Sequence, residues 1–303
     1  MQQQLSVLIP VYNHDVVSLV QGLHHQLSKS DAEFEILLID DQSLPEFQEN
    51  NSILNALPQV KMYKLPSKAG RSVARNFLAA QARFDYCLFV DCDSEIVDDL
   101  FIERYLSFCN GEEVVVCGGT AYHDSLPQSD RLLRWTYGVK NEVHSAELRN
   151  KRPCYYFQAF NFLIKRTLFL KIRFNELLKN YGHEDTLFRY ELNQRHVKVI
   201  HIDNPLYHIG IDTNSEYLKK TRQGVENLKL LMESPESQAL ISHMRLLRYY
   251  QVFNKTRTVF VVFGVFLLFR KAVLHNLNGK RPNMSLFNFY KLGYLCSLKY
   301  NKI

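Results

Sequence analysis

The stretch that decides the fold of this chain is YCLFVDCD, residues 86–93. Its first five residues form an apolar run that is typical of a buried strand. Asp91 and Asp93 follow with one residue between them, so in an extended chain both side chains point to the same side. Two carboxylates at a strand end suit a divalent cation such as Mg²⁺ or Mn²⁺. The stretch therefore predicts a metal site, although Asp93-Ser94 would also suit the cap of a following helix.

A second acidic pair, Glu184-Asp185, begins a segment with helical character that ends near Gln194. Carboxylates in a first helical turn are favoured by the helix dipole, and this capping role is one interpretation. The other is catalysis, in which a carboxylate takes a proton from a hydroxyl within hydrogen-bond reach. We expect Asp185 to be that base and Glu184 to orient the acceptor or the loop.

The composition is that of a globular protein. The chain has 303 residues, of which 46% are hydrophobic and 22% are charged, so a disordered chain is excluded. This length allows one large domain or two modest ones. The six cysteines show no CxxC spacing, which predicts reduced thiols in a cytoplasmic protein. No signal peptide is expected, because no basic start and long apolar stretch follow Met1.

The first half of the chain alternates between two kinds of segment. Apolar runs separated by helical segments are typical of a parallel sheet covered on both faces, so we predict an α/β, Rossmann-like, mostly parallel sheet flanked by helices. The predicted strands are 6–11, 35–39, 60–63, 85–90, 114–119, 160–164 and 197–202, and the predicted helices are 16–27, 46–57, 71–82 and 184–194. Residues 131–150, which include the only Trp, are interpreted as a lid or an acceptor-facing segment.

Polar residues follow three of the predicted strands. Tyr12-Asn13 follows the first, Asp40-Asp41 the second, and Asp91-Cys92-Asp93 the fourth. Ligands of such sheets bind beyond the carboxyl ends of the strands, so we expect one binding site there. The ring of Tyr12 would stack on a base, and Asp40 or Asp41 would accept the N–H of a pyrimidine. A role in a turn or a cap is an equal alternative for each of them.

Two further segments carry candidate ligand groups. The helix that follows Gly70 offers backbone N–H groups to an anion. Arg71 and Arg75 lie one turn apart on it and would reach a diphosphate or nearby carboxylates, unless they form an exposed basic face. His208 ends the run Pro205-Leu206-Tyr207 and would complete a Mn²⁺ site with Asp93, unless it is a structural histidine.

A change in composition near residue 214 predicts two domains, 1–214 and a helical C-terminal extension, 215–303. Most of the excess positive charge, a net +6, lies in the extension. Its longest apolar run covers only residues 259–269, whereas a bilayer span needs about twenty residues. Basic residues flank this run, so segment 255–276 is predicted to be an interfacial helix on an anionic membrane. A solvated basic face, a buried helix and a protein contact are the alternatives.

Five segments, taken together, resemble the inverting nucleotide-sugar glycosyltransferases of family 2, which have the GT-A fold. The segments are SVLIPVYN (6–13), FEILLIDDQS (34–43), GRSVARN (70–76), DCD (91–93) and GHEDTLFRYEL (182–192), and they occur in the family's order. Gln42 replaces the usual glycine of DDGS, and Cys92 is unusual within the metal motif. The C-terminal helices lie outside the resemblance.

The resemblance implies transfer of a sugar from a nucleotide-diphosphate donor, expected to be a UDP-sugar, to a glycan or lipid-linked glycan hydroxyl with inversion. It implies that Pro10, Tyr12, Asn13 and Asp40 or Asp41 hold the nucleobase. Arg71 and Arg75 would lie near the diphosphate, with Asp91 on the ribose or nucleotide. Asp93 would bind Mn²⁺ or Mg²⁺, with Asp91 and His208 as further ligands. Asp185 would be the base. From the cysteines and the basic C-terminal segment we expect a cytoplasmic protein, peripheral at the inner face of the membrane, and no nucleic acid partner.

Two other functions remain open at this point. A nucleotidyltransferase acting on a sugar phosphate would use a similar sheet, metal and carboxylates. It would usually carry a glycine-rich loop after the first strand, and residues 10–15 contain no glycine. A non-catalytic module would bind a membrane or a partner through the basic, aromatic C-terminus, but the acidic pairs argue against an inactive protein.

Overall fold

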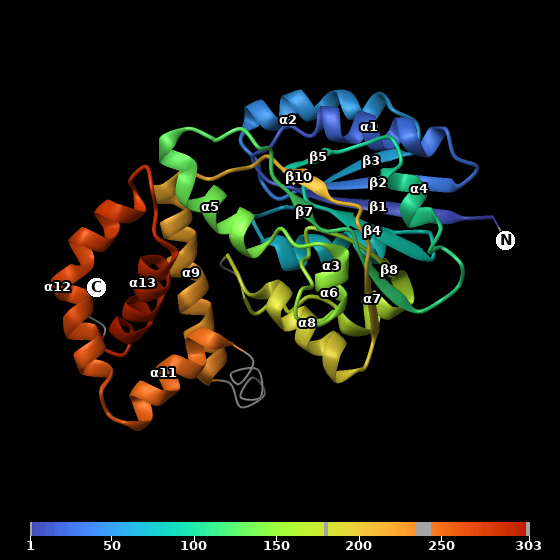
Figure 1. Ribbon diagram of the computed structural model, residues 1–303. Helices are drawn as coiled ribbons and strands as arrows, with labels where there is room; N and C mark the ends of the chain where they lie inside the picture. Colours follow the sequence, from blue (N-terminus) through green and yellow to red (C-terminus); the bar gives the residue numbers. More distant parts are fainter. Residues whose placement is uncertain (1, 179–180, 234–243, 301–303) are drawn as a thin grey trace. The chain divides into compact units, whose positions relative to one another are not determined.

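The computed structural model describes residues 2–178, 181–233 and 244–300, and the chain divides into two compact units (Figure 1). The first unit consists of residues 1–123, 142–179 and 184–210. The second consists of residues 124–141, 180–183 and 211–303. The division of the chain into independent domains at residue 214 stays a prediction.

The first unit is built on a seven-stranded sheet with the order β3-β2-β1-β4-β8-β6-β9. The strands are β1 (Gln4–Val11), β2 (Glu33–Asp40), β3 (Val60–Lys64), β4 (Tyr86–Val90), β6 (Val114–Cys117), β8 (Asn161–Lys165) and β9 (Lys198–His201). Four of the pairings are parallel, and β8 runs antiparallel to both β4 and β6. The predicted mostly parallel sheet is therefore confirmed.

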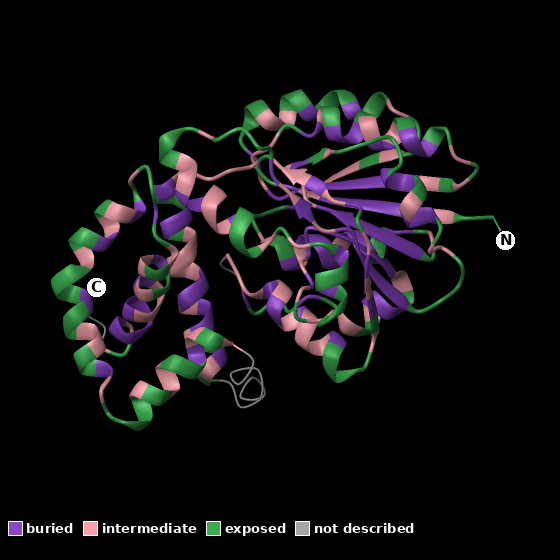
Figure 2. Ribbon diagram, in the orientation of Figure 1, coloured by how far each residue is buried: buried purple, intermediate pink, exposed green. Residues whose placement is uncertain are grey.

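Helices cover both faces of this sheet, as predicted (Figure 1). Both faces of the sheet are apolar, because successive side chains of β1 point to opposite faces. Val7 and Ile9 pack in one hydrophobic core, and Leu8 packs in the other. Figure 2 shows the central strands buried almost throughout. The helices of this unit are α1 (Val17–Ser28), α2 (Pro45–Asn51), η1 (Ser52–Ala56), α3 (Arg71–Gln81), α4 (Phe101–Leu106), α6 (Ala146–Asn150), α7 (Arg166–Ile172) and α8 (Glu184–Gln194).

A second, smaller sheet of the first unit brings together three short strands from distant parts of the sequence. It has the order β5 (Ser94–Ile96), β10 (Leu206–His208) and β7 (Thr120–Ala121). His208 pairs with Ser94 in the antiparallel ladder between β10 and β5. This pairing places His208 beside the residues that follow β4.

The second unit is helical in the part that the structure describes. Its elements are η2 (Ser129–Arg131), α5 (Leu132–Asn141), α9 (Asn214–Glu233), α11 (Arg245–Lys255), α12 (Val259–Leu277) and α13 (Met284–Ser297). Its core contains Leu133, Tyr217, Phe266, Phe287 and Tyr290. Among the described residues, α12 is the one helix whose length and composition would allow it to cross a membrane.

Residues 131–150, interpreted from the sequence as a lid or acceptor-facing segment, form two helices that belong to different units. Leu133 of α5 is fully buried in the core of the second unit. Arg149 of α6 is buried in the first unit, where its guanidinium donates to the carbonyl oxygens of Gly118 and Ile202. Each helix is therefore held in place by buried contacts within its own unit.

Candidate active site

Three polar strand ends meet at one edge of the large sheet. Strands β2, β1 and β4 are neighbours and parallel, so Asp40-Asp41, Tyr12-Asn13 and Asp91-Cys92-Asp93 follow them at the same edge. The predicted convergence of these segments is confirmed by the strand order. Pro10 lies within β1 and faces Ile39 of β2 in the register.

Asn13 joins the loops that follow β1 and β2. Its backbone N–H donates to Ser43 Oγ at 2.9 Å, and its Oδ1 accepts from the backbone N–H of Leu44 at 2.8 Å. Its φ of 49° lies in the left-handed region, which Asn tolerates better than most residues. Asn13 therefore has the turn role that was its alternative interpretation, and it shapes the site through the backbone.

Asp40 and Asp41 are buried, and both carboxylates organise loops. Asp40 accepts from the backbone N–H of Ser43 at 3.1 Å and from Gln48 Nε2 at 2.8 Å. Asp41 accepts from the backbone N–H groups of Ala69 and Gly70 at 2.7 and 2.9 Å. A carboxylate has about four acceptor positions, so these bonds leave room for a ligand donor.

Gln42 stands where the motif that the sequence resembles usually has a glycine, and its backbone adopts a conformation that favours glycine. Its φ is 63°, in the left-handed region, where a side chain is strained. Its side-chain amide donates to the carbonyl oxygen of Leu65. This hydrogen bond ties the strained turn to the end of β3 and offsets part of the strain.

Tyr12 is the exposed aromatic residue at this edge. Its side chain is 43% exposed, and Lys68 Nζ lies 3.6 Å from the centre of its ring. Such a cation–π contact occupies one face of the ring. A base that stacks on Tyr12 would use the other face or displace Lys68, a residue that was not among the sequence candidates.

Arg75 links the end of β4 to the start of α8. It is 1% exposed, and its Nη2 donates to Asp91 Oδ1 at 2.6 Å. Its Nη1 lies 3.6 Å from Glu184 Oε1, and Arg71 Nη1 lies 3.8 Å from the same oxygen. The arginines therefore reach nearby carboxylates, one of the two roles predicted for them. This contact brings the two acidic clusters of the sequence into one site.

Asp185 is half-buried at the start of α8, directly after Glu184. Burial raises the pKa of its carboxyl above the usual value, the Glu184 carboxylate raises it further, and Arg189 and Arg75 oppose the rise. A carboxylate with a raised pKa is a stronger base. The environment of Asp185 therefore suits the removal of a proton from a hydroxyl.

Burial also raises the pKa of the Asp91 carboxyl, while the guanidinium groups of Arg75 and Arg71 oppose that rise. The sequence predicted an extended stretch in which Asp91 and Asp93 point to the same side. Residues 91–93 instead leave the strand in a turn, so the alternation of a strand does not apply to them. Asp91 contacts Arg75, whereas Asp93 contacts His208.

Asp93 and His208 form the pair that suits a cation. Asp93 Oδ2 lies 3.4 Å from His208 Nε2, and the imidazole is flanked by the rings of Tyr122 and Phe160. No group of three or more His, Cys, Asp and Glu side chains is arranged for a metal within residues 2–178, 181–233 and 244–300. The pair nevertheless fits Mg²⁺ or Mn²⁺, because such ions often take one or two protein ligands and complete their shell with phosphate and water.

Gly210 gives Asp93 its space and was not among the predicted residues. A Cβ atom added at Gly210 would lie 2.5 Å from Asp93 Cβ, so any larger residue would move the aspartate. The two positions are far apart in the sequence, and only the pairing of β10 with β5 makes them neighbours. The sequence therefore held no signal for Gly210.

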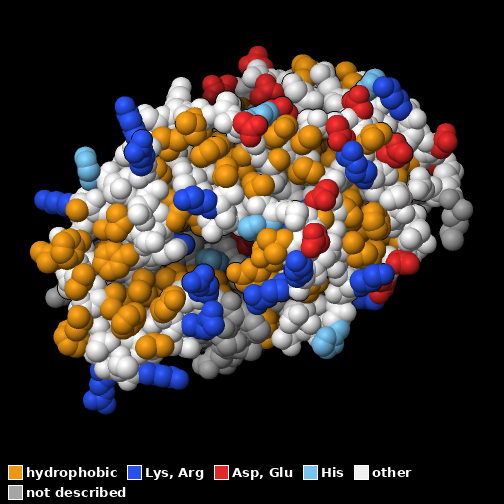
Figure 3. Space-filling model, in the orientation of Figure 1, with side chains coloured by type: hydrophobic (Ala, Val, Ile, Leu, Met, Phe, Trp, Pro, Cys, Tyr) orange, Lys and Arg blue, Asp and Glu red, His pale blue; other side chains and the backbone are white. Residues whose placement is uncertain are grey.

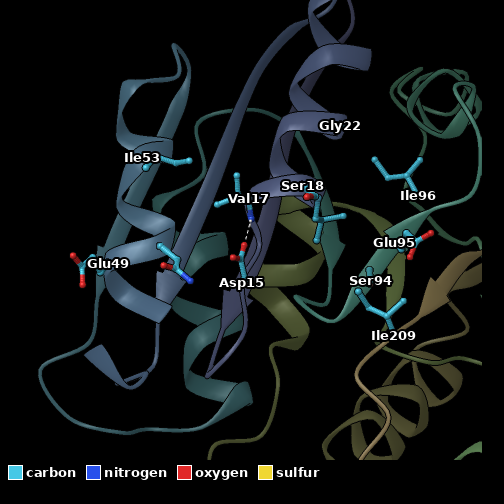
Figure 4. A pocket seen from close by; sticks show the side chains of 12 residues that line it. Asp15, Val17, Ser18, Gly22, Glu49, Ile53, Ser94, Glu95, Ile96 and Ile209 are labelled. Carbon is cyan, nitrogen blue, oxygen red and sulfur yellow. Dashed lines mark hydrogen bonds between the residues drawn. The ribbon is translucent and has the colours of Figure 1, made fainter. Parts of the chain in front are cut away.

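A groove of about 1090 Å³ lies beside the predicted site residues and includes none of them (Figure 4). It is lined by their neighbours Asp15, Ser94 and Ile209, together with residues of α1 and α2. Ser94 begins β5 directly after Asp93, but Asp93 is not among the residues that line the groove. The groove is thus distinct from the carboxylate site described above.

Comparison with known proteins gives the family to which this chain is similar. The family model described as "Glycosyl transferase family 2" matches residues 6–175, more than half of the chain. An uncharacterized glycosyltransferase of Haemophilus influenzae is 29% identical over 185 residues, which cover 61% of this chain and 69% of the relative. Glycosyltransferase GlyG of Streptococcus pneumoniae is 24% identical over 219 residues, which cover 68% of this chain and 70% of GlyG.

Solved structures of TarS from S. aureus share the fold. Residues 1–349 of TarS in complex with UDP-GlcNAc align with a TM-score of 0.53 and 16% identity, covering 100% of this chain and 93% of that chain. A longer TarS structure aligns with a TM-score of 0.51 and 19% identity over 82% of this chain. This alignment spans only 44% of the longer TarS chain.

Proposed function

The chain belongs to glycosyl transferase family 2, and we propose that it transfers a sugar from a UDP-sugar to a hydroxyl of a glycan or lipid-linked glycan, with inversion. The observation that carries this proposal is the pair of contacts made by Arg75. This residue binds Asp91 at 2.6 Å and lies 3.6 Å from Glu184. The donor-side and acceptor-side carboxylates therefore belong to one site, as a direct transfer requires.

The donor part of the proposal rests on the edge formed by β1, β2 and β4. Tyr12 offers an aromatic surface for a base, and Asp40 and Asp41 keep acceptor capacity for the N–H groups of a pyrimidine. Arg71, with its side chain 44% exposed, is the cation that a diphosphate would reach. One TarS structure is in complex with UDP and another with UDP-GlcNAc. These complexes support a uridine nucleotide and a hexosyl or N-acetylhexosaminyl group as the first donors to test.

The chemical step that we propose is a single displacement. Asp185 removes the proton of the acceptor hydroxyl, and the acceptor oxygen forms a bond to the anomeric carbon. The bond between that carbon and the diphosphate oxygen breaks on the opposite face, so the anomeric configuration inverts. The proton remains on Asp185 and the nucleoside diphosphate leaves with the electron pair. Glu184, held near Arg75, orients the start of α8.

Asp93 and His208 are the residues that we propose to hold Mn²⁺ or Mg²⁺. A bound cation would neutralise the negative charge that develops on the departing diphosphate. In this arrangement Asp91 stays with Arg75 and contacts the nucleotide. Asp185 supplies the base that takes the proton, and Glu184 helps to position the acceptor.

The proposed acceptor and the proposed location of the enzyme belong together. A glycan or lipid-linked glycan, as used in polysaccharide biosynthesis, is consistent with the membership of the family. An acceptor carried on a lipid would remain at a membrane surface. A cytoplasmic enzyme attached to the inner face of the membrane would reach it there.

Calorimetric titration with UDP, UDP-GlcNAc, UDP-glucose and GDP, each with Mn²⁺, with Mg²⁺ and with a chelator, tests the donor proposal. We expect the uridine nucleotides to bind more tightly than GDP, and binding to weaken in the chelator. Equal affinities for UDP and GDP would contradict the base assignment. Product analysis tests the reaction, since sugar transfer releases a nucleoside diphosphate, whereas nucleotidyl transfer would release pyrophosphate.

A further inference from the structure

The outward side of α12 is apolar although it lies on the surface of the protein. Phe260, Leu268 and Phe269 are exposed to 63%, 76% and 51%. Only 17% of the most apolar 18-residue stretch of this helix is buried. We use the name "apolar face" for its exposed side chains Phe260, Val261, Val265, Leu267, Leu268 and Phe269. Contiguous apolar surface of this kind marks an interaction site in soluble proteins.

The inward side of α12 is fixed to α13. Phe266 is fully buried and approaches Gly293 so closely that a Cβ atom there would lie 2.3 Å from its ring. The ring of Phe266 also contacts the rings of Phe289 and Tyr290, with centroids 6.1 and 5.8 Å away. Because α12 is packed on one side, its apolar face points away from the core of the second unit. A membrane-spanning position would require this packing to break.

The uninterrupted apolar run of α12 covers only part of the helix. It covers residues 259–269, and Arg270 and Lys271 follow directly. Eleven residues of helix measure about 16 Å, roughly half the thickness of a hydrocarbon core. A helix with an exposed apolar side and cations close to it lies in the interface, with its apolar side about 5–10 Å below the headgroups.

The charge around the apolar face identifies the kind of surface that it fits. Residues 237–303 contain eleven Lys and Arg and no Asp or Glu. Lys255 is exposed at the end of α11, Arg257 between α11 and α12, and Lys271 within α12. Arg245 and Arg248 are exposed on α11. Figure 3 shows hydrophobic side chains gathered over this part of the molecule with Lys and Arg around them. The combination matches an anionic lipid surface, which attracts each nearby cation.

We propose that the apolar face of α12 docks the protein on an anionic lipid bilayer, with α12 in the plane of the interface. A second copy of the chain is the competing occupant. Self-association through this face would bring two stretches with no acidic residue together, and the like charges would repel each other. The inference concerns the location of the enzyme and stands independently of its donor.

The proposal is tested by flotation of the full-length protein with lipid vesicles, in an assay that contains no nucleotide. Phosphatidylcholine vesicles with and without phosphatidylglycerol are the two probes. We expect the protein to float with the anionic vesicles, and the double substitution Phe260→Glu with Leu268→Glu to lower its partition at least about tenfold. Leu177→Glu is the matched control, because Leu177 is 83% exposed in the first unit and should float like the wild type.

A second pair of variants tests the charge independently of the apolar side chains. Lys255→Gln with Lys271→Gln should weaken binding to anionic vesicles about tenfold or more and leave any binding to neutral vesicles unchanged. UDP binding should not change in any of these variants, which keeps the test separate from the proposed donor. Wild-type protein that stays unbound with anionic vesicles would overturn the proposal. A lipid-free dimer that the double Glu substitution dissociates, together with unchanged flotation, would also overturn it.

Discussion

His201 Nδ1 accepts a hydrogen bond from Arg149 Nη1 at 2.8 Å, and both residues are almost fully buried. Because a guanidinium only donates, Nδ1 carries no proton, and Nε2–H donates to the carbonyl oxygen of Pro153 at 2.9 Å. His201 is therefore a neutral imidazole. Burial, together with the Arg149 charge, lowers its pKa from 6.5 to about 4.

This histidine should make the stability of the protein dependent on pH. In the unfolded chain His201 binds a proton below about pH 6.5, whereas in the fold it binds one only near pH 4. The free energy of unfolding should therefore decrease by up to about 3 kcal/mol as the pH is lowered from 6.5 to about 4. Urea unfolding of the wild type and of His201→Gln at several pH values measures this effect. A variant with the wild-type slope between pH 6.5 and 4 would contradict the assignment.

Replacement of Arg75 should destabilise the first unit. Arg75→Met leaves Asp91 without its 2.6 Å donor and Glu184 with only its contact to the more exposed Arg71, so we expect a loss of about 3–5 kcal/mol in the free energy of unfolding. Arg71→Met is the matched control, since the Arg71 side chain is 44% exposed and its contact to Glu184 is 3.8 Å long. The control should cost less than about 1 kcal/mol. Equal losses for the two variants would show that Arg75 has no special role.

Asp185→Asn should lower the rate of transfer by about 10²–10⁴-fold and leave UDP-sugar binding unchanged. It should also stabilise the protein at neutral pH. Because the pKa of Asp185 is raised in the folded protein, ionisation of this carboxyl lowers the free energy of unfolding. The loss is absent at pH values below the usual pKa of an aspartate and is complete above the raised pKa of Asp185. Thermal melts at neutral and acidic pH measure the difference. Glu191→Gln, on the exposed side of the same helix, is the control for both readouts.

Gly210→Ala should disturb the proposed cation pair. The new methyl group would lie 2.5 Å from Asp93 Cβ, so Asp93 would have to move relative to His208. We expect UDP binding in Mn²⁺ to weaken about tenfold, and binding in the chelator to stay the same. Gly264→Ala is the control because nothing lies within 4 Å of the Cβ position there. Unchanged titration of Mn²⁺-dependent binding would remove Gly210 and Asp93 from the site.

The sheet was predictable where the sequence carries a continuous apolar pattern. The runs that became β1, β2 and β4 are buried on both faces, so their composition alone indicated central strands, and the polar residues after them indicated the edge. The direction of β8 was not predictable, because a strand buried on both faces has the same composition in either direction. The three short strands of the small sheet are too brief to leave a pattern.

The individual contacts of the site were less predictable than its position. A carboxylate after a strand can bind a ligand or hold a loop, and both roles select the same residue types. The structure shows the loop role for Asn13, Asp40 and Asp41. The pairing of Asp93 with His208 joins positions 115 residues apart, and its cause is the ladder between β5 and β10.

The position of Arg75 has a consequence for how the sequence can change over evolutionary time. One almost fully buried guanidinium contacts both Asp91 on the proposed nucleotide side and Glu184 on the proposed acceptor side. Loss of Asp91 would leave that cation with a single counter-ion, and loss of Glu184 would do the same from the other direction. The three positions should therefore covary among relatives. A relative in which one of these residues is replaced should also carry substitutions at the other two.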